Sequence, residues 1–173
     1  MKTLLTGALT YDGLGGTPLR QDVLIEGERI LAIDQDLPRE GARVWEMDGL
    51  SLSPGFIDAH SHNDWCALWE DPLPAFEPFI RQGITGFVTG NCGLSAAGFE
   101  PDSPHLSGLG GGIFQLDESF KRLGSAGQFF RKTDRWMPCN LGLLIGHNTA
   151  RASVSGSANR PLTDAEMTRM LNL

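Results

Sequence analysis

The sequence predicts an α/β protein in which a small sheet of short strands precedes parallel strands that alternate with helices. Two observations support this class. Residues up to 53 contain short apolar and alternating segments separated by glycine-containing turns. After Ser53-Pro54, three compact apolar or β-branched runs cover residues 56–59, 84–89 and 141–145. Such runs are typical of parallel strands that are covered on both faces.

The first region is expected to hold strands within residues 4–9, 22–26, 29–33 and 44–48, followed by a short segment at 50–52. Gly27-Glu28 separates the second strand from the third, and a glycine in the first position of a two-residue loop is typical of a type II′ hairpin turn. We expect a small antiparallel sheet with one buried face, and no catalytic chemistry in it.

The second region reads as β-α-β-α-β-α. A helix is expected over 74–82, ended by Gly83, and capping-box spacing predicts helix starts after Ser125 and Thr163. The long Gly- and Ser-rich segment 93–124 includes three glycines at 110–112 that we expect to be mobile. The alternation implies a parallel sheet. Because a closed eight-stranded barrel needs about 250 residues, we interpret the chain as the N-terminal piece of something larger.

Composition narrows the classes of partner. The chain has 173 residues, a formal net charge of -7 and no cluster of Lys or Arg, which argues against nucleic-acid and anionic-membrane partners. No apolar run is long enough to span a bilayer, and the first residues read as a strand and not as a signal peptide. Three cysteines, an odd number without paired spacing, make a disulfide framework improbable and favour the cytoplasm.

Candidate metal ligands follow the predicted strands of the second region. His60 and His62 are two positions apart, so on a strand both imidazoles point the same way. Cys92 follows the second strand, and His147 follows the third. Ligands in parallel α/β folds meet the carboxyl ends of the strands. Imidazoles and a thiolate together suit zinc, although two solvated histidines and a buried structural cysteine are the alternatives.

The remaining polar candidates are less specific. His147 could be a ligand, a substrate contact, a hydrogen-bond donor behind the ligands or a structural residue. Asp58 and Asp64 could orient the imidazoles, and Asp58 is the better placed of the two. The other cysteines, Cys66 and Cys139, are expected to be packing residues, and His105 a loop residue.

Four stretches of sequence carry a family resemblance. Residues 53–62 (SPGFIDAHSH) resemble the first barrel strand of the amidohydrolase superfamily. Residues 82–85 (QGIT) followed by 88–93 (VTGNCG) resemble the D-aminoacylase (N-acyl-D-amino-acid deacylase) branch of that superfamily, as do 146–151 (GHNTAR) and 158–163 (ANRPLT). The resemblance extends over essentially the whole chain.

The resemblance implies an incomplete TIM-type (β/α) barrel, with its first three strands in residues 54–173, preceded by the N-terminal part of a β-sandwich in 1–53. It implies zinc ligation by His60, His62 and Cys92, with Cys92 on the tighter zinc. The family's two later histidines have no counterpart in this chain, and its acid–base aspartate is expected beyond Leu173. Asn63 stands where the family commonly has an acidic residue.

The implied activity is zinc-dependent hydrolysis of the amide of an N-acyl-D-amino acid, a small-molecule substrate. The chain alone is expected to be inactive, to bind zinc weakly, and to associate with the missing C-terminal part of the barrel or with itself. One alternative is a dihydroorotase- or hydantoinase-like enzyme for cyclic amides, although those use a carboxylated lysine and no lysine lies near a predicted strand end. The other is a non-catalytic binding or assembly fragment, which the early stop favours.

Overall fold

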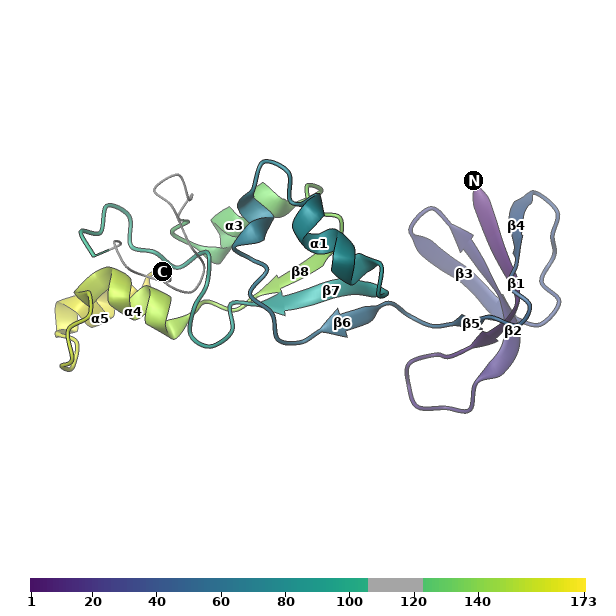
Figure 1. Cartoon of the computed structure of the whole chain (residues 1–173), viewed down its shortest axis with the longest axis horizontal. Coiled ribbons are helices and arrows are strands. Elements are labelled where there is room, and N and C mark those ends of the chain that lie inside the picture. Colours follow the sequence, from purple (N-terminus) through teal and green to yellow (C-terminus); the bar gives the residue numbers. More distant parts are fainter. Residues whose placement is uncertain (106–122) are drawn as a thin grey trace. The chain divides into compact units, whose positions relative to one another are not determined.

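The computed structural model describes residues 1–105 and 123–173. The glycines at 110–112, which the sequence predicts to be mobile, lie outside the described residues. The chain divides into two compact units, Met1–Pro54 and Gly55–Leu173 (Figure 1). Each unit has its own sheet, and the two units are described in turn.

The N-terminal unit is a five-stranded sheet built around its first strand. Its strands are β1 (Lys2–Thr10), β2 (Leu19–Glu26), β3 (Arg29–Asp34), β4 (Ala42–Glu46) and β5 (Ser51–Leu52). The order is β3-β2-β1-β4, and β5 also pairs with β1. Leu4 and Ala8 of β1 are fully buried, as the alternating pattern predicts. The predicted strand positions are therefore confirmed.

The expected antiparallel arrangement of this sheet is wrong, because the sheet is mixed. β2 runs antiparallel to β1 and β3, but β4 and β5 both run parallel to β1. The connection after β3 carries the chain to the other edge of β1, which reverses the expected direction of β4. Alternation of side chains predicts which residues face the core, but it carries no information about strand direction.

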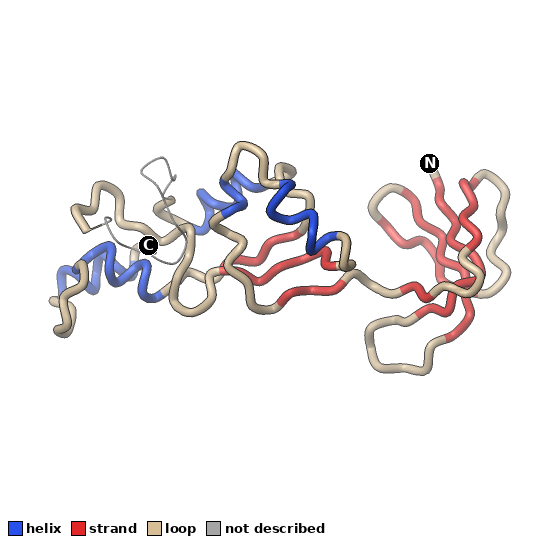
Figure 2. The backbone as a smooth tube through the Cα atoms, viewed as in Figure 1, coloured by secondary structure: helices blue, strands red, loops and turns tan. Residues whose placement is uncertain are grey.

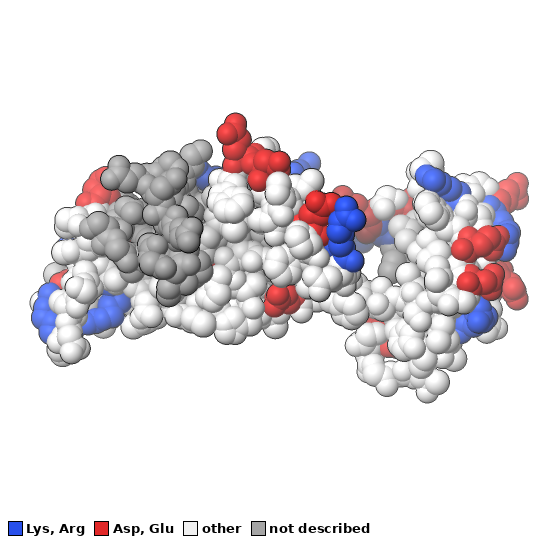
Figure 3. Space-filling model, viewed as in Figure 1, with Lys and Arg blue, Asp and Glu red and all other residues white. Residues whose placement is uncertain are grey.

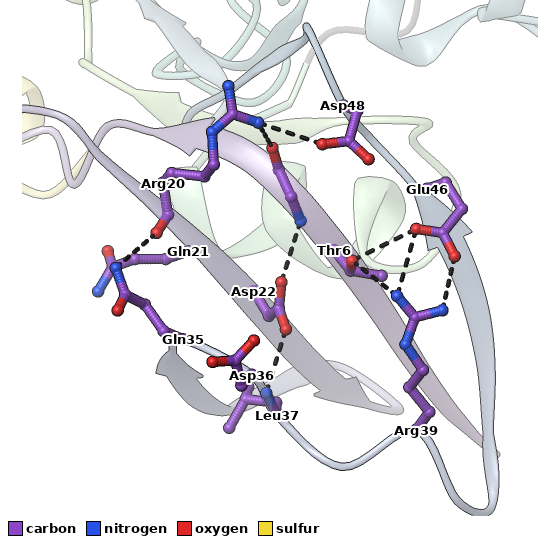
Figure 4. Close-up of a pocket in the computed structure, with 11 residues that line it drawn as sticks. Thr6, Arg20, Gln21, Asp22, Gln35, Asp36, Leu37, Arg39, Glu46 and Asp48 are labelled. Carbon is purple, nitrogen blue, oxygen red and sulfur yellow. Dashed lines mark hydrogen bonds and ion pairs between the residues drawn. The ribbon is translucent and has the colours of Figure 1, made fainter.

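This unit has a polar hollow, drawn in Figure 4, in which the lining side chains form hydrogen bonds and ion pairs with one another and with the backbone. The carboxylate of Asp22 accepts hydrogen bonds from the backbone N–H groups of Gly7 at 3.0 Å and Leu37 at 3.1 Å. The ion pairs are Arg39–Glu46 at 2.7 Å and Arg20–Asp48 at 3.2 Å. Figure 3 shows acidic and basic side chains adjacent on the visible surface of this unit. These contacts tie the β3–β4 connection to the sheet.

The C-terminal unit contains a three-stranded parallel sheet in the order β6-β7-β8. The strands are β6 (Phe56–Asp58), β7 (Ile84–Thr89) and β8 (Asn140–Leu143), close to the predicted runs. Two helices, α1 (Leu73–Ile80) and α3 (Ala126–Thr133), lie on the same side of the sheet (Figures 1 and 2). A short 3-10 helix, η1 (Cys66–Leu68), precedes α1.

The core of this unit lies between the sheet and those two helices. Phe76 of α1 and Phe87 of β7 are buried and meet edge to face, with ring centroids 5.4 Å apart. Phe129 of α3 is fully buried in the same cluster. The side chain of Ser125 accepts a hydrogen bond from the N–H of Gln128 and caps α3, as its spacing predicts. Helix and strand patterns in the sequence therefore position this core correctly.

Among the described residues the three apolar strands leave an edge and apolar positions exposed, as is expected of three strands taken from a larger barrel. Phe56 and Ile57 in β6 are 62% and 70% exposed, and Leu144 just after β8 is 51% exposed. A continuous apolar run is typical of a strand that is buried on both faces, but α1 and α3 cover one face only. The described part of the chain thus presents an apolar sheet edge and face to its surroundings.

Two further helices, α4 (His147–Ser155) and α5 (Asp164–Leu171), pack together beyond the ends of the strands (Figure 1). α5 begins with the predicted capping box, in which Thr163 and Glu166 bond to each other's backbone N–H groups. α4 is not predicted by the sequence reasoning, because its buried face mixes small polar residues, such as Thr149 and Ser153, with only two apolar ones, Ala150 and Val154. Within the described ranges, no helix is long and apolar enough to cross a membrane.

Candidate metal centre

The two histidines are held by backbone contacts just after β6. The Asp58 carboxylate accepts a hydrogen bond from the backbone N–H of His60 at 3.1 Å, and the N–H of Ser61 donates to the carbonyl oxygen of Val88 in β7 at 3.0 Å. Ser61 itself is buried. β6 ends at Asp58, so the two histidines lie in the bend and loop that follow the strand and not on the strand itself.

The cysteine is presented by a tight turn after β7. Cys92 has a positive φ of 54°, and so does Gly93 at 76°, while the N–H of Leu94 bonds to the carbonyl of Asn91 at 3.0 Å. Positive φ at both central positions is the pattern of a type I′ turn. Gly90 also has a positive φ, and a Cβ there would lie 1.9 Å from the carbonyl oxygen of Leu144. The turn leaves the thiol exposed.

The three donor atoms converge although they come from two separate segments. His60 Nε2 lies 3.3 Å from Cys92 Sγ, and one ligand atom from each of His60, His62 and Cys92 lies within 4.8 Å of the others. The two imidazole rings are 5.8 Å apart between centroids and inclined by 67°. This is the one group of three or more His, Cys, Asp or Glu in the described part of the chain that could hold a metal ion.

The donor set and its spacing fit zinc. Zn–S bonds of about 2.3 Å and Zn–N bonds of about 2.0–2.1 Å, at a tetrahedral angle, place nitrogen and sulfur roughly 3.6 Å apart. The 3.3 Å between His60 Nε2 and Cys92 Sγ is close to that value. Imidazole and thiolate are both ligands that zinc prefers. Three protein ligands leave a coordination position for water or a substrate oxygen, as in catalytic zinc sites.

Asp64 braces the loop that follows His62. Its side chain is fully buried, and its Oδ2 accepts a hydrogen bond from the backbone N–H of Ala96 at 2.7 Å. Burial raises the pKa of the Asp64 carboxyl group to about 6, although N–H groups including those of Ala96 and Gly90 oppose the rise. Asp64 thus connects the loop after His62 with the segment after Cys92.

The other predicted candidates lie around this cluster. The contact shown for Asp58 is to the backbone of His60 and not to an imidazole. His147 is exposed and is the first residue of α4; its ring is not among the three converging donors. The start of α4 nevertheless lies beside the cysteine turn, because the N–H of Thr149 donates to the carbonyl of Gly93 at 3.1 Å.

The residues without a predicted role behave as packing and loop residues. Cys66 and Cys139 are half-buried against the core cluster, and burial raises the pKa of both thiols, that of Cys139 to about 11. His105 is exposed in a loop. These positions agree with the sequence reasoning.

One residue at the site was not singled out by the sequence reasoning. The side-chain amide of Asn91 donates to the carbonyl oxygens of Ser61 at 3.2 Å and Val88 at 2.9 Å. Asn91 therefore bonds to the residue between the two histidines, while its own neighbour is Cys92. An asparagine between a glycine and a cysteine signals a turn, but no local pattern predicts a partner thirty positions away.

Comparison with known proteins gives relatives along almost the whole chain, although no family model matches it. The chain is 35% identical to an N-acyl-D-aspartate deacylase and 34% identical to a D-aminoacylase, both of Alcaligenes xylosoxydans xylosoxydans. These matches cover 96% and 98% of the chain, but 32% and 34% of the relatives. A dihydroorotase of Lactobacillus leichmannii is 45% identical over 83 residues, or 48% of the chain. The chain thus spans about one third of the length of the relatives that match it throughout.

Solved structures agree with these relatives. A D-aminoacylase whose binuclear metal centre has been studied superposes with a TM-score of 0.82 at 32% identity, over 99% of this chain and 35% of that chain. An N-acyl-D-glutamate deacylase of Bordetella bronchiseptica, in complex with zinc and a phosphonate inhibitor, superposes with a TM-score of 0.79 at 31% identity, over 98% of this chain and 34% of that one. The mixed α/β fold of this chain is similar to the corresponding third of a D-aminoacylase whose structure is described as defining a subset of amidohydrolases, with a TM-score of 0.82 at 32% identity. Within that class, the chain is a relative of the D-aminoacylases.

Proposed function

We propose that this chain supplies the first part of a zinc-dependent amidohydrolase that hydrolyses the amide bond of N-acyl-D-amino acids. The observation that carries the proposal is the convergence of His60, His62 and Cys92 within 4.8 Å. Support comes from relatives over the whole chain that are deacylases of N-acyl-D-amino acids, one of them in complex with zinc. The proposed place of action is the cytoplasm.

The finer architecture is part of the proposal. The three parallel strands β6, β7 and β8 would be the first strands of a TIM-type (β/α) barrel in residues 54–173. The mixed sheet would be the N-terminal part of a β-sandwich in residues 1–53. The exposed apolar positions Phe56 and Ile57 support this interpretation, because in a completed barrel such positions are covered.

In this proposal the chain's own residues hold and orient the metal. His60 and His62 would each donate a neutral imidazole nitrogen and Cys92 a thiolate, and the Asp58 carboxylate fixes the backbone of His60. Bound zinc would supply Lewis-acid chemistry, polarising the amide carbonyl and lowering the pKa of a water molecule. The acid–base aspartate would lie outside these 173 residues, so the chain alone is expected to be inactive. Its partners would be the rest of the barrel or a second copy, and the substrate.

A cyclic-amide hydrolase of the dihydroorotase type is the second candidate, because several partial matches are to dihydroorotases. Those matches cover between 35% and 59% of the chain, whereas the deacylases match nearly all of it. The cysteine at the end of β7 favours the deacylase, and the ends of β6, β7 and β8 carry no lysine that could be carboxylated. His147 remains a candidate substrate contact in either case.

The test has two parts. The 173-residue chain should bind one or more zinc ions, and His60→Ala, His62→Ala and Cys92→Ser should each weaken binding. His105→Ala, which replaces an exposed histidine outside the cluster, should not. Turnover of N-acetyl-D-amino acids and of dihydroorotate should then be compared for the chain joined to the remainder of its barrel. Zinc binding that survives all three ligand substitutions, or turnover of dihydroorotate alone, would contradict the proposal.

A further inference from the structure

The cluster is built from two segments that no regular strand pairing holds together at the point where the ligands lie. The β6–β7 ladder ends at the pair Asp58 and Phe87, before the histidines begin. Beyond that pair, the backbone N–H of Ser61 bonds to the carbonyl of Val88. Among the other contacts between the two segments, the Asp64 carboxylate accepts from Ala96 beyond the turn, and the Ser61 hydroxyl donates to Val88 at 3.4 Å. Asn91 is the side chain that reaches from the residue beside Cys92 to the residue between the two histidines.

We infer that Asn91 is a positioning residue that sets the distance between the two imidazoles and the thiolate. Its amide nitrogen lies 3.2 Å from the carbonyl oxygen of Ser61 and 2.9 Å from that of Val88. A primary amide has two N–H donors, and Asn91 uses both of them on carbonyl oxygens. The inference rests on the proposed function, since it concerns ligation of the same metal.

The position of these two hydrogen bonds allows Asn91 to affect both the histidine segment and the cysteine turn. Ser61 lies between His60 and His62, so a bond to its carbonyl fixes the peptide that precedes His62. Asn91 itself is joined to Cys92 and begins the turn that exposes the sulfur. The Asn91 side chain therefore links Ser61, which lies between the two histidines, to the turn that carries Cys92, and both of its hydrogen bonds have ordinary lengths.

The chemistry of the amide also predicts which substitutions matter. Asn91→Asp keeps the shape but replaces the amide nitrogen and its two N–H donors with one carboxylate oxygen, which the Ser61 and Val88 carbonyl oxygens repel. Asn91→Ala removes the bonds and leaves the Ser61 carbonyl without its side-chain donor. Groups that orient metal ligands typically change metal affinity by about 10–100-fold when they are lost. We expect a loss in that range for both variants.

Asn140 is the matched control. Its side-chain amide also donates to a backbone carbonyl, that of Thr85 at 3.3 Å, and it lies in the same parallel sheet. Asn140 opens β8 and Thr85 lies near the start of β7, so this bond is at the opposite end of the strands from the cluster. Asn140→Ala removes a comparable bond without touching the metal-binding end.

The experiment measures affinity for Zn²⁺ and the spectrum of Co²⁺ in the 173-residue chain, with folding checked by urea titration. We expect Asn91→Asp and Asn91→Ala to bind Zn²⁺ about 10–100-fold more weakly than the unaltered chain. We also expect them to weaken the thiolate-to-cobalt charge-transfer band from Cys92, while Asn140→Ala keeps both properties. Unchanged affinity and band in Asn91→Asp, or an equal loss in Asn140→Ala, would overturn the inference. Absence of a thiolate–cobalt band in the unaltered chain would instead refute the proposed metal site, and the inference with it.

Discussion

Cys92→Gly should raise the stability of the zinc-free chain and lower that of the zinc-bound chain, because Cys92 combines a left-handed backbone with a candidate sulfur ligand. A non-glycine residue at φ 54° costs about 1–2 kcal/mol relative to an ordinary conformation. Cys92→Gly relieves that strain but gains chain entropy in the unfolded state, which offsets about 0.4–1 kcal/mol. The net expectation is that Cys92→Gly is more stable than Cys92→Ala by roughly 0.5–1 kcal/mol when zinc is removed with a chelator.

In chelator the unaltered chain carries the same backbone strain as Cys92→Ala, so Cys92→Gly should be more stable than the unaltered chain, and zinc should reverse the order of those two. At a free zinc concentration about one hundred times its Kd, the unaltered chain gains about 2.7 kcal/mol, because the ion binds the folded state. Both Cys92 variants lack the sulfur ligand and gain less. The order of stability with zinc should therefore be the unaltered chain first and Cys92→Gly second.

Urea titration under reducing conditions provides the assay, read by tryptophan fluorescence, to which Trp65 contributes from its buried place against Phe99 in the C-terminal unit. If Cys92→Gly and Cys92→Ala unfold at the same urea concentration in chelator, the turn stores no strain. If zinc stabilises the two variants as much as the unaltered chain, the sulfur is not a ligand. Either result would refute the expected opposition between backbone strain and zinc ligation at Cys92.

Three further outcomes are expected. Gly90→Ala should destabilise the C-terminal unit by about 3 kcal/mol or more in urea titration, because its Cβ would meet the Leu144 carbonyl, whereas Gly83→Ala, also at positive φ but with a nearest contact of 3.4 Å, should cost less. The Arg160 guanidinium holds the pKa of Glu166 far below its ordinary 4.5. The stabilisation of the folded state by ionised Glu166 should therefore be complete above pH 4.5 and fall as the pH drops below that value. Glu166→Gln should remove this acid sensitivity. If the free energies of unfolding of Glu166→Gln and the unaltered chain differ by the same amount at every pH, the expectation is contradicted. Iodoacetamide should label Cys92 before Cys139, whose pKa is raised to about 11, and zinc should slow labelling at Cys92 alone, as peptide mass spectrometry would show.

Local patterns in the sequence were sufficient for most elements of the fold. The helix cap at Ser125, the capping box at Thr163 and the apolar runs of β6, β7 and β8 predict structure because their causes are local. The direction of β4 was not predictable in this way, because it depends on the path of a connection and not on side-chain alternation. α4 was missed because the residues on its buried face are small and mostly polar, with no stripe of large apolar side chains.

The residues of the candidate site also fall into those that local sequence patterns predict and those that depend on contacts between distant segments. His60, His62 and Cys92 could be named because each follows a recognisable strand, and the ends of parallel strands share one edge of a sheet. Asn91 could not, because its importance depends on a bond to Ser61 that only the folded chain displays. Asp64 is similar, since its carboxylate meets Ala96 from a distant segment.

The closeness of the three donors along the polypeptide has a consequence for biosynthesis. His60 and Cys92 are 32 positions apart, and closing a loop of that length costs about 3 kcal/mol in chain entropy before constant terms. A growing polypeptide that has emerged from the ribosome a little beyond Cys92 already contains every one of these donors. The donors are therefore synthesised together, whereas the contacts that hold the cysteine turn, from Leu144 and Thr149, are added about fifty positions later, so the site gains its final geometry only when β8 and α4 have formed.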